Sequence, residues 1–107
     1  MFAILSTFLN LNSMEVLCIN DVFTQLQRSK IKKLPIKDKI YSIRDVVTYT
    51  DGVKGLLLNE IHNPYVQHDS GLGSYEPTFN INRFTTLSGD VLTKELLNKI
   101  SKTVDYE

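Results

Sequence analysis

The chain has 107 residues, 42% of them apolar and 22% charged, which is typical of one globular domain with a single modest core. Twelve basic residues balance twelve acidic ones, so no overall positive field attracts the chain to a polyanion. Cys18 is the single cysteine, which excludes an intrachain disulfide, and its apolar neighbours predict a buried thiol. We expect a cytoplasmic protein.

Residues 1–13, MFAILSTFLNLNS, form a short apolar stretch. They lack the basic start and the cleavage site of a signal peptide, and they are too short to span a bilayer. A short amphipathic helix is one interpretation, because one helical face would carry Phe2, Leu5, Phe8 and Leu9. We favour an N-terminal extension ahead of a natural start at Met14, since strand-like patterning begins at Glu15.

The first half of the domain predicts two strands separated by a long connection. Residues 14–20, MEVLCIN, have the length and composition of a strand. Residues 21–39 mix polar and isolated apolar side chains around Pro35, which predicts an irregular loop. Residues 39–50 are rich in β-branched and aromatic residues and predict the second strand. Its apolar face alternates through Tyr41, Ile43, Val47 and Tyr49.

A hairpin and a second loop follow. Asp51-Gly52 is a strong hairpin signal, and the partner strand is expected at residues 56–61, LLLNEI. Residues 62–75 predict a loop, and residues 76–87, EPTFNINRFTTL, predict two short extended pieces around a tight turn at NINRF. Residues 88–107 change to helical spacing, which predicts a short amphipathic helix with a frayed end. Its apolar positions are Leu92, Leu96 and Ile100.

These elements predict a mostly β fold. About five short strands in residues 14–87 are expected to close into a small SH3-like barrel, because closure removes exposed strand edges. The C-terminal amphipathic helix and tail occupy residues 88–107.

Several segments resemble an uncharacterised group of small bacteriophage and prophage proteins. The segments are LCIND, DKIYSIRDVV, DGVKGLLLNEIHNP, YEPTFNINRF and TTL. The family patterns G-L-x-L-x-E-I-x-N-P and E-P-x-F-x-x-x-R-F are the specific part of the match, which runs from Met14 to Leu87 over about two thirds of the chain. The resemblance implies an SH3-like barrel in a phage or prophage setting, and it implies no activity.

The histidines and carboxylates around residues 60–76 do not form a known catalytic or metal motif. His62 and His68 are six residues apart, beside Asp69, without the short ligand spacings of a zinc site, so we expect no metal and no cofactor. Glu60 and Glu76 lack an accompanying nucleophile and base, so we expect no enzyme. We expect Glu76 to pair with Arg83, with Glu60 sharing that arginine, and to hold the loop against the barrel.

The leading functional hypothesis is a protein-interaction module. It would bind an unknown protein in a groove between residues 21–39 and residues 62–75, with Tyr65, Tyr75 and His62 as the contact residues. Recognition of proline-rich segments is not favoured, because the chain has no tryptophan.

Two other hypotheses stay open. A small nucleic-acid-binding barrel would use Lys32, Lys33 and Lys37 in the lysine cluster of residues 30–39. A homo-oligomer would form through the C-terminal helix. Its contact positions, which could equally pack on the barrel, are Val91, Leu92, Leu96 and Ile100.

Overall fold

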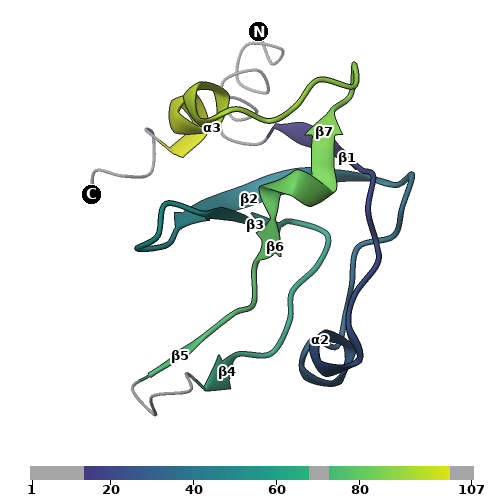
Figure 1. Ribbon diagram of the computed structural model, residues 1–107, viewed down its shortest axis with the longest axis vertical. Coiled ribbons are helices and arrows are strands. Elements are labelled where there is room, and N and C mark those ends of the chain that lie inside the picture. The colour runs from purple at the N-terminus through teal and green to yellow at the C-terminus, as the bar shows by residue number, and fades with distance from the viewer. Residues whose placement is uncertain (1–13, 68–72, 102–107) are drawn as a thin grey trace, which may run out of the picture.

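The computed structural model describes residues 14–67 and 73–101, and Figure 1 shows an antiparallel sheet with one helix at each end of the molecule. The predicted N-terminal extension, His68 and Asp69 lie outside the described residues. The five strands of the sheet follow the order β6-β3-β2-β1-β7. Their bounds are β1 Glu15–Cys18, β2 Ile40–Thr48, β3 Lys54–Leu58, β6 Phe79–Asn80 and β7 Phe84–Thr86.

The mostly β fold predicted by the sequence is confirmed, but closure of a barrel is not. Strands β6 and β7 are the two edges of the sheet, and no ladder joins them within residues 14–67 and 73–101. The 3-10 helix η1, Ile81–Arg83, connects these two edges directly. It occupies the position of the tight turn predicted at NINRF.

The long first connection contains a helix that the sequence analysis missed. Helix α2, Gln25–Lys30, begins at a capping box formed by Thr24 and Gln27. The Gln27 backbone N–H donates to Thr24 Oγ1 at 3.1 Å, and the Thr24 N–H donates to Gln27 Oε1 at 2.8 Å. The prediction of an irregular loop across residues 21–39 is therefore wrong over this turn and a half.

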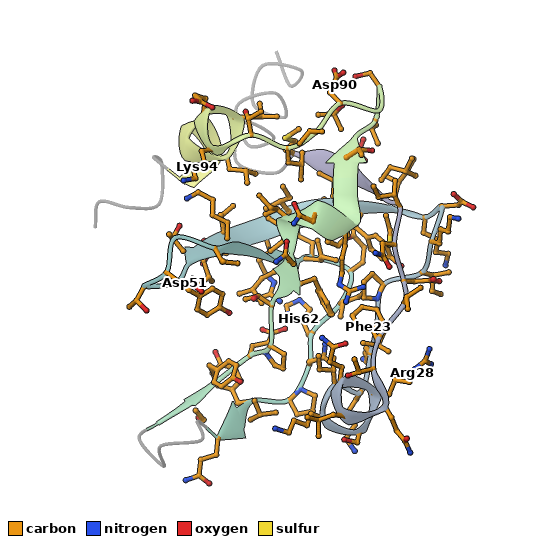
Figure 2. The ribbon with its side chains drawn as sticks, in the orientation of Figure 1. Phe23, Arg28, Asp51, His62, Asp90 and Lys94 are labelled. Atoms are coloured by element: carbon orange, nitrogen blue, oxygen red, sulfur yellow. The ribbon has the colours of Figure 1, made fainter. Side chains whose placement is uncertain are left out.

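The β2–β3 hairpin turns where Asp51-Gly52 predicts it. Gly52 has φ +88°, a conformation that glycine adopts without strain, and its N–H donates to Tyr49 O at 2.9 Å. The Tyr49 N–H donates to Val53 O at 2.9 Å and closes the hairpin, and the Val53 N–H donates to Asp51 Oδ1 at 3.0 Å. Asp51 lies at the tip of this hairpin (Figure 2).

A bulge at Arg44 changes which alternate residues of strand β2 face the core. Ile43 pairs with Leu58 and Asp45 pairs with Leu57, so Arg44 is one extra residue on β2. A one-residue shift moves each following side chain to the opposite face of the sheet. Tyr41 and Ile43 consequently lie in the core, whereas Val47 and Tyr49 do not. The single alternating face predicted for this strand is therefore wrong beyond Ile43.

The core contains residues from the strands, from the long first connection and from the C-terminal helix. Its buried members are Val16, Cys18, Phe23, Tyr41, Ile43, Leu56, Leu58, Ile61, Phe79, Phe84, Leu92 and Leu97. Burial raises the pKa of the Cys18 thiol, as expected for a thiol that serves in packing.

Helix α3, Lys94–Ser101, packs on strand β2. Leu92 and Leu97 are buried and Leu96 packs at the edge of the core, so the predicted apolar set omits Leu97. Val91 is 73% exposed and does not belong to this face, and the Ile100 side chain lies outside the described residues. The helix therefore shares one core with residues 14–87.

The second predicted loop forms a narrow arm. Strands β4, Val66–Gln67, and β5, Ser74–Tyr75, pair as a separate antiparallel ribbon that projects away from the sheet (Figure 1). Among the described residues, no helix is long and apolar enough to cross a membrane.

Candidate binding groove

The base of the β4–β5 arm is held by an ion pair between Arg44 and Glu76. Arg44 Nη2 lies 2.9 Å from Glu76 Oε2, and the same guanidinium donates to the carbonyls of Leu58 and Ile61 at 3.1 and 3.2 Å. The Asn63 N–H also donates to Glu76 Oε2 at 2.9 Å. The bulge on β2 places Arg44 at this point, so one irregularity of the sheet fixes the position of the arm.

The Glu76 carboxylate is charged in the folded protein at neutral pH. Burial raises its pKa, but the hydrogen bonds from Arg44 and the Asn63 N–H, with the charges of Arg44 and His62, outweigh burial and lower the pKa below its ordinary value. Two donors, Arg44 Nη2 and the Asn63 N–H, bond to the same carboxylate oxygen, Oε2. Glu76 is therefore a structural residue, as predicted, but with a different partner.

The predicted pairing of Glu76 and Glu60 with Arg83 is wrong. The Arg83 guanidinium lies over the Phe23 ring, 3.7 Å from its centroid, and Nη1 donates to Val22 O at 2.8 Å. Glu60 instead accepts from the Ser42 N–H and Oγ–H, at 2.8 and 2.7 Å. The bulge on β2 brings Arg44, and not Arg83, to the Glu76 carboxylate.

Asn63 joins the arm to the long first connection. The Lys33 N–H donates to Asn63 Oδ1 at 2.7 Å, and Asn63 Nδ2 donates to Lys33 O at 2.9 Å. The side chain is buried and completes two backbone bonds as a neighbouring strand would. The groove expected between residues 21–39 and residues 62–75 is therefore closed at this contact.

An open groove lies instead between the arm and the outer face of the β2–β3 hairpin. Its volume is about 710 Å³, within the range of ligand-binding clefts. In Figure 1 the hairpin tip and the arm project from the same side of the molecule. The groove is lined by Val47, Tyr49, Asp51, Val53, Leu57, Tyr65, Ser74, Tyr75, Glu76 and Thr78.

Three tyrosines, Tyr49, Tyr65 and Tyr75, give the groove an aromatic lining. Tyr65 is 68% exposed, Tyr75 is 38% exposed, and the Tyr49 hydroxyl is 2.6 Å from Thr78 Oγ1. Gly55 underlies the last contact, because a Cβ there would collide with the Thr78 side chain and touch the Tyr49 ring. Glycine at this position therefore lets Tyr49 and Thr78 pack closely against the sheet.

The carboxylate of Asp51 gives the groove an acidic end. Among the described lining residues, the other carboxylate, Glu76, is neutralised by Arg44, and none is a lysine or arginine. An apolar aromatic surface with one unneutralised acid suits a segment that carries apolar side chains and a cation.

The structure brings together only part of the predicted binding set. Tyr65 and Tyr75 line the same groove, whereas His62 is exposed beside Glu76 and does not line it. The exposed side chains of Lys32, Lys33 and Lys37 lie on the long connection, outside the groove. Tyr49 was missed because the predicted alternation assigned it to the core; the adjacent Asp51-Gly52 turn was the signal that it lies at a hairpin end.

No protein-family model matches this chain, and no curated protein or solved structure is significantly similar to it. The described residues contain no group of three or more histidine, cysteine, aspartate or glutamate side chains placed to hold a metal ion.

Proposed function

We propose that this protein is a non-enzymatic interaction module that binds an extended segment of a partner protein in the groove between the β2–β3 hairpin and the β4–β5 arm. The segment would place apolar side chains against Tyr49, Tyr65 and Tyr75 and a lysine or arginine near Asp51. This proposal keeps the predicted tyrosines and moves the groove to the other side of the arm.

One observation carries the proposal. The apolar, tyrosine-lined groove is open to solvent, although the arm beside it is anchored by an ion pair and by Asn63. Tyrosine and other aromatic side chains contribute large contact areas at protein interfaces with little loss of side-chain entropy. Anchoring the base of the arm further reduces the entropy lost on binding.

The strand order and the 3-10 helix before the last strand support an SH3-like architecture, in which a long first loop and an arm flank one sheet. A phage or prophage accessory role in the cytoplasm rests on the sequence resemblance alone. SH3-like architecture hosts many functions, so the groove and not the fold supports the choice of a binding role.

Selection from a displayed peptide library on the immobilised full chain tests this function. We expect selected peptides to combine aromatic or aliphatic residues with a lysine or arginine. Tyr65→Ala should weaken binding by about 1–2 kcal/mol, as expected for an exposed aromatic contact. Leu26→Ala, a change at a similarly exposed side chain on α2, is the control. Equal affinity of both variants and the original chain would overturn the groove assignment.

The lysine cluster supports a second candidate, binding of nucleic acid. The side chains of Lys30, Lys32, Lys33, Lys37 and Lys39 are all exposed, and the described residues place no carboxylate within ion-pair distance of them. This function predicts an affinity that falls steeply with salt and is lost when Lys32, Lys33 and Lys37 are changed together to Gln. Absence of binding to single- and double-stranded DNA and RNA at low salt would exclude it.

A further inference from the structure

A second, smaller cavity lies beside the groove, and the hydrogen-bonded side chains of Tyr49 and Thr78 line both. Its volume is about 200 Å³, and it shares Tyr49, Val53 and Thr78 with the groove. Phe23, which lines this cavity, lies between α2 and the sheet (Figure 2). The remaining lining residues are Phe23, Gln27, Ile31, Lys54, Gly55, Phe79, Asn80 and Arg83.

Two cations line this cavity without a carboxylate partner among the described residues. Lys54 is only 9% exposed, and its Nζ donates to Thr48 Oγ1 at 2.7 Å, which leaves two N–H groups available. The hydrogen bonds of Arg83 all use Nη1, so Nε and Nη2 of the guanidinium remain available in the described part of the chain.

Two amide side chains add further donors. Gln27 uses its Oε1 to accept from the Thr24 N–H, and Asn80 uses its Oδ1 to accept from the Asn82 N–H at 2.8 Å. Each helix-capping contact therefore consumes the carbonyl and leaves the NH₂ group as the available end of the amide. Both amides line the cavity.

Among the described residues, no acidic side chain lines the cavity to accept from these donors. Burial lowers the pKa of Arg83, and Asp21 opposes that shift from nearby, but Asp21 does not line the cavity and its Oδ2 accepts from the Lys37 N–H. The two side-chain hydroxyls in the described part of the lining, those of Tyr49 and Thr78, bond to each other. The lining is thus rich in donors and poor in acceptors.

We propose that this cavity binds a compact oxyanion, the phosphate or carboxylate group of a small molecule, through Lys54, Arg83, Gln27 and Asn80. Guanidinium and ammonium groups form charge-assisted bonds with both kinds of group, and two such cations on one cavity repel each other unless an anion lies between them. The volume of about 200 Å³ is several times the roughly 30 Å³ of one water, which accommodates the anionic group and a short attached chain.

Titration of the isotope-labelled full chain by NMR tests the site, with sodium phosphate and sodium acetate as probes and sodium chloride at equal ionic strength as the reference. We expect saturable shifts of the Gln27 and Asn80 side-chain NH₂ signals and of Arg83 Nε–H with phosphate, with acetate or with both. The probe that binds more tightly identifies the anionic group. Shifts that match those in chloride for both probes would overturn the proposal.

Variants separate a built site from general charge attraction. Lys54→Met keeps the aliphatic stem and removes the charge, and it should weaken binding about tenfold, whereas Lys30→Met at an exposed position should change it less than twofold. Asn80→Asp keeps the acceptor that caps η1 but adds a negative charge at the rim, so it should abolish binding without depending on a buried substitution. Unchanged binding in Asn80→Asp would overturn the proposal even if Lys54→Met fails to fold.

Discussion

The base of the β4–β5 arm and the groove beside it are opposite kinds of surface. At the base, the charged side chains of Arg44 and Glu76 are largely removed from water, with 26% and 8% of each exposed, and both make several hydrogen bonds. In the groove, Tyr65 and Val53 are apolar but remain in contact with water. The charged residues at the base have their hydrogen-bond partners within the chain, whereas these groove residues are not covered by other parts of it.

This difference distinguishes residues that hold the conformation of the arm from residues that could contact a partner. Buried polar groups are stable where every donor and acceptor has a partner, and such a network then holds one conformation. Covering the exposed apolar side chains of a groove with a partner removes them from water and stabilises the complex. Of the carboxylates that attract attention in the sequence, Glu76 therefore anchors the arm, and the neighbouring tyrosines are the candidate contact surface.

The largest expected effect is at the arm base. Arg44→Met should lower the free energy of unfolding by about 2–4 kcal/mol, because it leaves the Glu76 carboxylate buried without its cation, while the partial exposure of Arg44 moderates the loss. Urea unfolding measures this change. Lys30→Met is the matched control at an exposed cation and should change the stability by less than about 0.5 kcal/mol. Equal stability of the two variants would contradict the anchoring role.

A smaller loss is expected at Asn63. Asn63→Ala removes two hydrogen bonds to the Lys33 backbone, and water can reach Lys33, so the free energy of unfolding should fall by about 1–2 kcal/mol. Amide hydrogen exchange should also become faster at Lys33. Exchange at Lys33 that matches the original chain would show that Asn63 does not join the two segments.

The pH dependence of stability provides a third test. The pKa of Glu76 is lower in the folded chain than in the unfolded chain, so this carboxylate stabilises the fold above the unfolded pKa, about 4.3. That contribution is lost as the pH falls from there through the folded pKa. Thermal unfolding between pH 7 and pH 3 should show a shallower acid loss in Glu76→Gln than in the original chain. Parallel curves would contradict the assignment.

The smallest effect on stability is expected in the groove. Tyr65→Ala should change the free energy of unfolding by less than about 0.5 kcal/mol, because the side chain is largely exposed. The same urea experiment measures it. A loss as large as that of Arg44→Met would show that the tyrosine is part of the scaffold and would remove the contrast between the two regions.

Local signals in the sequence predicted the parts of the fold that local chemistry determines. The Asp51-Gly52 turn, the first strand and the turn at NINRF all depend on neighbouring residues, and the structure contains all three. Helix α2 was also within reach, because Thr24 and Gln27 have the spacing of a capping box. It was missed because no regular apolar face accompanies it.

The candidate site was less predictable because it depends on contacts between distant residues. The bulge at Arg44 has a weak local signal, Asp45 in the middle of an apolar strand, whose Oδ1 accepts from the Val46 N–H at 2.8 Å. Without that bulge, Tyr49 is assigned to the core and Arg44 has no route to Glu76. Two errors in the sequence analysis, the partner of Glu76 and the position of the groove, thus share one cause.

Photo-crosslinking of a selected peptide tests the central claim most directly. Benzoylphenylalanine replaces Tyr65 in one protein and Lys33 in another, so the two proteins report on the groove and on the long connection beyond the arm base. We expect a crosslink from position 65 that excess unlabelled peptide suppresses, with none from position 33. A crosslink from position 33 without one from position 65 would contradict it and would move the binding surface to the lysine-rich connection.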